Sequence, residues 1–546
     1  MIETPTHNGQ ERGTARTRRP SRFPRPRALP AASAVVCALL LLPLLYLVIR
    51  GTQATPAGWR LILRWETVEL ALRSLGLAAA VTAASTLLGV PAAWLATRSD
   101  LPGRRIWAVL FALPLVIPSY IAAMTFLSSL GPKGLFQQLL EPLGIERLPD
   151  IGGFVGAAIV LTAVSYPYVY LVTAAGIRGL DPSLEEAART LGRTPIQVFR
   201  HVTVPMLRPA IAAGGLLVAL YTLHDFGGVS LMRFTTFTQA IYLQYKAAFD
   251  RAPAAILSMM LVLIALVVVV AEQRQRGRAA YHRSGGGSKR PPGVVPLGSW
   301  RTPALLFAAG LVAFTFLLPA GVLLYWAIRG LLRGGPLNLT LSAAGSSVLV
   351  SGIGAALAIL AAAPVALYTA RSRSRGARLA EPISYAGFAL PGIVVALALV
   401  FITARFAPVI YQSLFLVAIA YVILFFPQAS EPMRMGLRQL DPHVEQAART
   451  MGARPVRVVR WITLPQILPP TLAGAALVFL TAMKELPATL LLRPTGFETL
   501  ATRVWTSASA GLFSKAAVPA LLLLVLSAIP LFFLAGRIDV EEVRPD

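Results

Sequence analysis

Few side chains in this sequence could do chemistry of their own. Asp225, Glu485 and Tyr168 carry oxygen atoms and lie at or near the ends of long apolar segments. If these segments cross a membrane, a charge at its centre costs about 3 kcal/mol, so such a carboxylate usually has a partner or a function. We therefore expect Asp225 and Glu485 either to line a solute pathway or to pair with His224 or Lys484. Tyr168 belongs to a tyrosine cluster that suits packing as well as solute binding.

The sequence has no motif for catalysis or for a resident metal. The five histidines do not fall at metal-ligand spacing, and the single cysteine, Cys37, excludes an internal disulfide and a cysteine-built metal site. No G-x-x-x-x-G-K-[ST] loop for nucleotide phosphates occurs. We expect a chain that is not an enzyme, that binds no metal or cofactor of its own, and that takes any energy from ATP through another subunit.

The composition is that of a membrane protein. Of the 546 residues, 56% are hydrophobic and 14% are charged, whereas soluble domains average about 25% charged residues. A spanning helix needs roughly 20 mostly apolar residues. Twelve candidate runs lie near 31–49, 74–97, 106–130, 153–176, 206–228, 254–271, 303–328, 342–370, 381–404, 409–430, 466–489 and 516–536. We expect an all-α polytopic membrane protein with about 12 transmembrane helices, the first of them a retained anchor.

The basic residues gather between the apolar runs and predict the sidedness of the protein. The net charge is +26, and with a cytoplasmic N-terminus about two thirds of the Lys and Arg residues fall on the cytoplasmic side. Loops rich in Lys and Arg face the cytoplasm in membrane proteins. We therefore expect both termini in the cytoplasm, and we interpret the charge as a topological signal rather than as a nucleic-acid-binding surface.

An internal repeat divides the chain into two halves. Residues 180–211 and 440–471 are identical at 15 of 32 positions, at a constant offset of 260. A basic segment rich in Gly, Ser and Pro separates the halves and is typical of a flexible linker. The predicted organisation is a cytoplasmic tail at 1–30, a first half at 31–272, a cytoplasmic linker at 273–301, a second half at 302–537 and a tail at 538–546. Six spans in each half make the repeats parallel, and a pathway forms between such repeats.

Each copy of the repeat predicts a short helix–turn–helix outside the membrane. Asp181 can cap a helix that begins at Pro182, where the missing N–H costs nothing, and Gly192 permits the positive φ that ends it. Asp441 and Gly452 repeat this arrangement. One interpretation is a packed loop whose likeness survives only from duplication. A loop that faces water has little packing reason to stay alike while the spans diverge, so we favour a surface that binds the same partner twice.

The two copies resemble the coupling-loop signature of ABC importer permeases. In that signature Glu-Ala-Ala is followed after three residues by Gly, and after nine more by aliphatic-X-aliphatic-Pro. With their acidic neighbours, the matching residues are Glu185, Glu186, Ala187, Ala188, Gly192 and Pro205 in the first copy, and Glu445, Gln446, Ala447, Ala448, Gly452 and Pro465 in the second. Gln446 departs from the usual glutamate, which puts a charged contact on that side in doubt unless Glu445 replaces it.

The resemblance implies a fused, two-half permease of the type I importer fold in a bacterial inner membrane. A homodimer or pair of ABC ATPase subunits would use ATP and Mg²⁺ and would bind the two loops, and an extracytoplasmic binding protein would deliver the substrate. The segments 100–105 (DLPGRR), 113–123 (LPLVIPSYIAA), 165–171 (SYPYVYL) and 224–245 are similar to ferric-iron transport permeases. Ferric iron prefers hard oxygen ligands, and this is the reason to consider Asp225, Glu485 and Tyr168 as pathway residues.

Other functions fit parts of the sequence. Fused permeases for thiamine or phosphonate are similar, so these solutes are alternative substrates. A twelve-helix secondary transporter driven by an ion gradient belongs to a different class, and the doubled loop argues against it. A membrane-embedded enzyme would need clustered acid, base or metal residues, and a structural scaffold would not explain two like loops.

Overall fold

The computed structural model describes residues 28–53, 56–144, 146–247, 252–279, 293–332 and 337–541. Within these ranges the regular elements are helices, with one isolated bridge between Ser99 and Val295. Most of both predicted tails, and residues 280–292 of the predicted linker, lie outside the described residues.

The helices follow one another along the two halves as follows. The first half contains α1 (Ala28–Thr52), α2 (Pro56–Arg60), α3 (Trp65–Arg98), α4 (Arg104–Leu110), α5 (Ser119–Leu130), α6 (Leu135–Leu140), α7 (Gly153–Arg178), α8 (Pro182–Thr190), α9 (Pro195–Val198), α10 (Val204–His224), α11 (Gly227–Leu231), α12 (Phe237–Ala247) and α13 (Ala252–Ala279). The second half contains α14 (Arg301–Val312), α15 (Leu318–Leu332), α16 (Leu337–Arg371), α17 (Arg375–Ile383), α18 (Ala386–Ala389), α19 (Gly392–Phe406), α20 (Leu414–Gln439), α21 (Pro442–Thr450), α22 (Pro455–Val458), α23 (Leu464–Lys484), α24 (Pro487–Leu492), α25 (Leu500–Ser509) and α26 (Phe513–Glu541). Single-turn 3-10 helices cover Leu61–Leu63, Leu113–Val116, Glu141–Leu143, Gly298–Trp300 and Pro408–Ile410, and π-helical turns cover Phe199–Thr203, Ala313–Leu317 and Val459–Thr463.

The described residues contain nine helices that are long and apolar enough to cross a membrane, or ten if one bent pair counts as a span. The bent pair replaces the predicted straight run at 106–130: its two parts, Arg104–Val116 and Ser119–Gln138, meet at 94°. Pro118 lies at the bend and holds the residue before it in an extended conformation. The predicted runs at 381–404 and 516–536 correspond to the shorter apolar helices Gly392–Phe406 and Phe513–Ile529. The coarse prediction of an all-helical membrane protein is confirmed, and the count of twelve stays a prediction.

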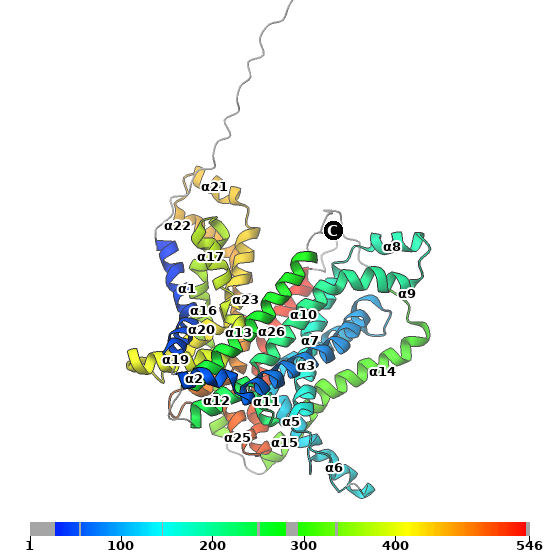
Figure 1. The fold of residues 1–546 in the computed structure, drawn as a ribbon. Helices are drawn as coiled ribbons and strands as arrows, with labels where there is room; N and C mark the ends of the chain where they lie inside the picture. Colours follow the sequence, from blue (N-terminus) through cyan, green and yellow to red (C-terminus); the bar gives the residue numbers. More distant parts are fainter. Residues whose placement is uncertain are drawn as a thin grey trace, which may run out of the picture.

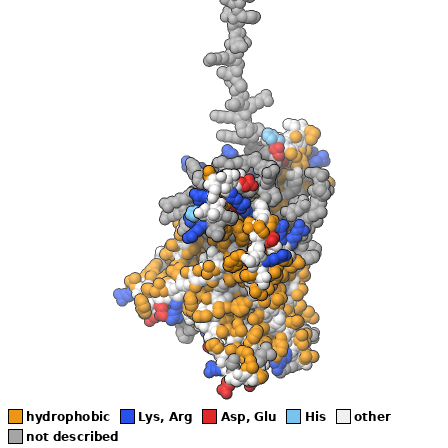
Figure 2. Space-filling model, turned by 90° about the vertical axis from the view of Figure 1, so that its right-hand side faces the viewer, with side chains coloured by type: hydrophobic (Ala, Val, Ile, Leu, Met, Phe, Trp, Pro, Cys, Tyr) orange, Lys and Arg blue, Asp and Glu red, His pale blue; other side chains and the backbone are white. Residues whose placement is uncertain are grey.

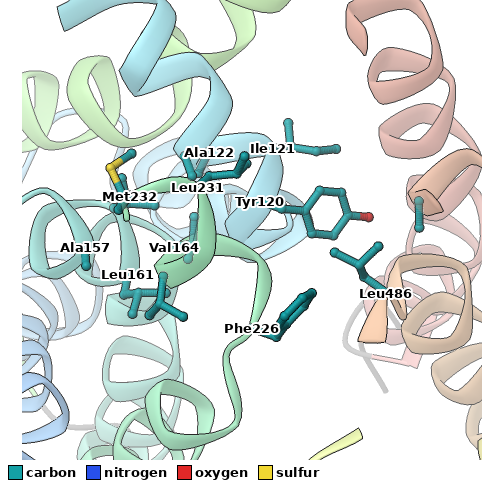
Figure 3. Packing of buried hydrophobic residues seen from close by; sticks show 14 of the residues in the cluster. Tyr120, Ile121, Ala122, Ala157, Leu161, Val164, Phe226, Leu231, Met232 and Leu486 are labelled. Atoms are coloured by element: carbon teal, nitrogen blue, oxygen red, sulfur yellow. The ribbon is translucent and has the colours of Figure 1, made fainter. Parts of the chain in front are cut away.

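The first helix of each half packs on the other half. Helix α1 contacts α16, α17 and α19, and the Ser33 hydroxyl donates a hydrogen bond to the carbonyl of Pro364 over 3.0 Å. Helix α14 buries Ala308 and Leu311 in a cluster with Tyr166 and Tyr170 of α7. The largest apolar cluster also includes side chains of both halves, so their interface is part of the core. Figure 3 shows Tyr120 of α5 beside Leu486 of the second half.

The surface fits a membrane environment. Figure 2 shows hydrophobic side chains in a broad band over one face, with charged side chains gathered above the band and at its lower edge. We call residues 180–211 and 440–471 the first and second repeat loops. Their helices α8 and α21 lie at the same end of the molecule, whereas α6, α15 and α25 lie at the opposite end (Figure 1).

Candidate functional site

Both repeat loops begin with the predicted helix cap. The Asp181 carboxylate accepts a hydrogen bond from the Ser183 N–H over 3.0 Å, and Asp441 accepts one from the His443 N–H over 2.9 Å. The hydrogen bonds from Ser183 lower the pKa of Asp181. Each acid therefore satisfies an N–H group that the first helical turn leaves without an internal partner, and this part of the sequence prediction is confirmed.

The two loop glycines end α8 and α21 in a conformation that disfavours other residues. Gly192 has φ of +81° and Gly452 has φ of +85°. Their N–H groups donate to the carbonyls of Arg189 and Arg449 over 2.9 and 3.0 Å. A Cβ atom at either glycine would meet no atom within 4 Å. Substitution there would therefore strain the backbone rather than cause a clash.

Glu185 and Glu445, which belong to the predicted coupling residues, are both buried and point into the protein. The Glu185 side chain is 6% exposed and accepts hydrogen bonds from Thr203 over 2.8 Å and from Arg98 over 2.5 Å. Arg98 is the last residue of α3, and its own side chain is 3% exposed. This buried ion pair joins the first repeat loop to a membrane-spanning helix of the same half.

The second repeat loop has the same arrangement with a different arginine. The two terminal guanidinium nitrogens of Arg371, the last residue of α16, each donate to Glu445 over 2.5 Å, and the Thr463 hydroxyl donates over 2.6 Å. Burial by itself would raise the pKa of Glu445, but the hydrogen bonds from Arg371 and Thr463 outweigh it, so that the pKa is lowered. The sequence analysis missed both arginines, although each directly follows a long apolar run.

The remaining coupling candidates divide into exposed and buried positions. Ala188 and Ala448 are 8% and 6% exposed and pack inward. Glu186, Ala187, Gln446 and Ala447 are exposed at corresponding positions of α8 and α21. Pro205 and Pro465 lie in the first turns of α10 and α23, directly after the π-helical turns, where a missing N–H is tolerated.

Each loop also exposes apolar side chains that the sequence analysis did not single out. Leu191 and Met451 are both 83% exposed, directly before the loop glycines, and Leu184 and Val444 are 51% and 46% exposed. Leu184 and Ala187 of α8 and Leu191 directly after it lie on one side of the helix, because they are three and four residues apart. An exposed apolar face at corresponding positions of two loops is typical of a surface that binds a partner.

The two acids considered for the pathway cap short helices near the interface between the halves. Asp225 is buried and accepts from the Val229 N–H over 3.0 Å, and Glu485 accepts from the Ala488 N–H over 3.0 Å. These acids therefore stabilise the first turns of α11 and α24, at breaks that directly follow α10 and α23. The Tyr168 ring lies 5.7 Å from the Tyr221 ring.

One lysine forms a contact between the halves at this level. The Lys484 ammonium donates to the Leu115 carbonyl over 3.3 Å, and the Tyr120 hydroxyl donates to the Lys484 carbonyl over 3.5 Å. Tyr120 and Leu115 belong to the first half, so Lys484 does not pair with the neighbouring Glu485 in the way considered from the sequence. In the part of the chain that the structure describes, no three His, Cys, Asp or Glu residues lie close enough to hold a metal ion.

The two like halves and their paired loops define a membrane-embedded transport subunit. A family model described as binding-protein-dependent transport system inner membrane component matches residues 85–278 and 354–539, which include both repeat loops. The chain belongs to this family. It is thus a multi-pass inner membrane permease of an ABC importer, a non-catalytic subunit that translocates the substrate.

Three relatives show the range of the similarity. The Fe(3+)-transport system permease protein FbpB 2 of Haemophilus influenzae is 35% identical over 502 residues, which cover 91% of this chain and 95% of that protein. The ferric transport system permease protein FbpB of Actinobacillus pleuropneumoniae is 24% identical over 85% of this chain and 71% of its own length. The sulfate transport system permease protein CysT of Salmonella typhimurium is 34% identical over 36% of this chain and 69% of its own length.

The substitution Arg98→Met should release α8 from α3. It leaves the buried Glu185 carboxylate without its counter-charge, and breaking such a pair costs about 3–5 kcal/mol. Hydrogen–deuterium exchange followed by mass spectrometry should show faster exchange of the backbone amides of residues 182–203.

Arg73→Met is the matched control on the same helix. Arg73 pairs with Glu69, but these side chains are 48% and 43% exposed, and exposed pairs contribute only about 0–1 kcal/mol. Exchange over residues 182–203 should match that of the unmodified protein in this control. Unchanged exchange in the Arg98→Met protein would show that the ion pair does not hold the loop.

Proposed function

We propose that this permease imports ferric iron, which an extracytoplasmic binding protein delivers and a pair of ABC ATPase subunits drives by binding the two repeat loops. The observation that carries the proposal is the pair of like loops at one end of the molecule, each joined to the membrane helices by an ion pair of a buried glutamate (Figure 1). ATP and Mg²⁺ would bind to the ATPase subunits, because the sequence has no phosphate-binding loop. This chain would carry no cofactor.

The exposed residues of the loops suit docking into a groove of each ATPase. Ala187 and Ala447 are small and permit close approach, while Leu191 and Met451 offer apolar side chains that a groove could bury. Glu186 offers a carboxylate on the first loop only, since Gln446 takes its place on the second. The buried Glu445 is not available to replace that charge. We therefore expect the two ATPase contacts to differ.

The topology that goes with this function is the one predicted from the sequence. We propose twelve membrane passages in two parallel sets of six, with both termini and both repeat loops in the cytoplasm. The positive-inside distribution of Lys and Arg supports this orientation. A cytoplasmic position of the loops is necessary for contact with an ATPase that uses cytoplasmic ATP.

Similarity and side-chain chemistry support iron as the substrate. The two relatives with ferric names match most of this chain, whereas the sulfate relative matches about a third. Asp225, Glu485 and Tyr168 place oxygen atoms near the interface of the halves, and we propose that the pathway passes them. Selectivity would reside mainly in the binding protein. Thiamine and phosphonate are the alternative substrates.

The double substitution Leu191→Asp and Met451→Asp should abolish assembly with the ATPase. Loss of an apolar side chain from a buried contact costs about 2 kcal/mol or more, so two such changes, about 4 kcal/mol together, should lower ATPase affinity by roughly a thousandfold. Co-purification and ATP-dependent uptake measure the effect. Folding should be intact, because both side chains are 83% exposed.

Leu143→Asp is the control for this pair. Leu143 is 75% exposed and lies in the 3-10 helix directly after α6, at the opposite end from the repeat loops (Figure 1). Its substitution should leave ATPase binding unchanged. Full co-purification of the double variant would refute docking at the repeat loops.

The substitutions Asp225→Asn and Glu485→Gln should reduce uptake of radioactive ferric iron in proteoliposomes that contain the binding protein and the ATPase. Asn and Gln keep a side-chain carbonyl that can accept the helix-capping hydrogen bond, so mainly the charge is lost. Asp150→Asn is the control, because Asp150 also accepts a backbone N–H, from Gly152 over 2.9 Å, but is exposed. Wild-type rates would remove both acids from the pathway, and uptake of thiamine or phosphonate in place of iron would refute the substrate.

A further inference from the structure

Two apolar cavities follow helix α14 on the side where it crosses the first half. One has a volume of about 540 Å³ and the other about 500 Å³, within the range of about 300–1,000 Å³ for ligand sites. Phe307 lines both, so the cavities adjoin one another along α14. We call them together the α14 groove. Figure 2 views the molecule from the side on which α14, α8 and α9 lie, and hydrophobic side chains dominate this face below the charged region.

The larger cavity lies where the first repeat loop enters the membrane helices. Its walls include Trp94 of α3, Phe199 of the π-helical turn, Leu207 of α10 and Trp300 before α14. All of the side chains that line it are apolar. A polar solute would lose its hydrogen bonds with water there without replacement, so the transported substrate is a poor occupant.

Four exposed arginines are sequence neighbours of residues that line the larger cavity. They are Arg178, Arg200, Arg208 and Arg301. None of them has an ion-pair partner among the residues that the structure describes. Arg178 ends one candidate span, and Arg200 and Arg301 lie within the first four residues of two others. This position corresponds to the level at which phospholipid head groups meet the hydrocarbon.

We propose that the α14 groove binds one acyl chain of an anionic phospholipid from the bilayer, with its phosphate among these arginines. An acyl chain is the apolar occupant that a bilayer supplies everywhere, and anionic head groups bind basic clusters at the membrane surface. The site adjoins the buried ion pair of the first loop. Trp94 contacts the Phe199 ring at 4.9 Å, and the Arg98 guanidinium lies 5.3 Å from the Trp94 ring.

Filling the groove tests the proposal. Ala304 lines the larger cavity and Ala309 of the same helix is exposed and lines neither, so Ala304→Phe is the variant and Ala309→Phe the matched control. The purified protein is delipidated, titrated with dioleoylphosphatidylglycerol and measured by native mass spectrometry. The unmodified and Ala309→Phe proteins should retain one lipid, and Ala304→Phe should bind it at least tenfold more weakly. Equal retention by Ala304→Phe and Ala309→Phe would overturn the site.

A second titration tests the head group. Dioleoylphosphatidylcholine has the same chains and no net charge, and it should bind the unmodified protein at least tenfold more weakly. Arg200→Gln combined with Arg301→Gln should remove this difference. Equal binding of the two lipids by the unmodified protein would overturn recognition of an anionic head group.

A measurement on the unmodified chain tests the site even if the Ala304→Phe protein misfolds. Phosphatidylglycerol with a photoreactive group in its acyl chain is incorporated into nanodiscs with the protein and activated by light. Crosslinked peptides should be enriched in residues 199–211 and 297–315. Crosslinks spread evenly over the lipid-facing helices would overturn a specific groove.

Discussion

The buried ion pair beneath each repeat loop is the interaction on which the proposed coupling depends. The Glu185 carboxylate cannot leave Arg98 without a cost of about 3–5 kcal/mol, because an unpaired charge would remain inside the protein. Glu445 is equally buried, but its partner Arg371 is 34% exposed, so the cost in the second half is smaller. The pair therefore holds the loop to the end of α3 or α16 while other contacts change. The same carboxylates accept hydrogen bonds from Thr203 and Thr463. Loop helix, spanning helix and the start of α10 or α23 thus meet at one residue in each half.

The two ion pairs differ, although the loops are alike. Arg371 donates two hydrogen bonds and its side chain is 34% exposed, whereas Arg98 donates one and is 3% exposed. Arg98 also lies over the Trp94 ring. Water and salt screen the more exposed pair more effectively. The first loop is therefore held by a more deeply buried ion pair, and the second by a bidentate ion pair that is more exposed. The halves would consequently respond differently to ionic strength.

Features that depend on nearby residues were predictable from the sequence, and features that depend on distant ones were not. The caps and turns at Asp181 and Gly192 involve residues two or three positions apart, so local chemistry sufficed. The arginine partners lie 87 and 74 residues from their glutamates, and the offset that reveals the repeat does not align Arg98 with Arg371. An apolar run also does not show which half its helix packs on. The sequence therefore did not predict that α1 packs on the second half and α14 on the first. The charge of Asp225 suggested a pathway residue. Its hydrogen bond with the Val229 N–H depends on the break between α10 and α11, which the continuous apolar run does not reveal.

The arrangement of α10 and α23 connects the two ends of the proposed mechanism. Each helix begins next to the threonine that bonds to the buried glutamate, and each ends at the acid that caps a short helix near the interface of the halves. With 21 residues each, they are about 30 Å long at 1.5 Å per residue. A helix transmits displacement along its axis because its backbone hydrogen bonds resist compression. Movement of a repeat loop would therefore reach Asp225 or Glu485 directly, and in the second half it would also act on the contact of Lys484 with the Leu115 carbonyl. That contact must break if the halves separate there, which makes the end of α23 the place where a loop movement changes the interface.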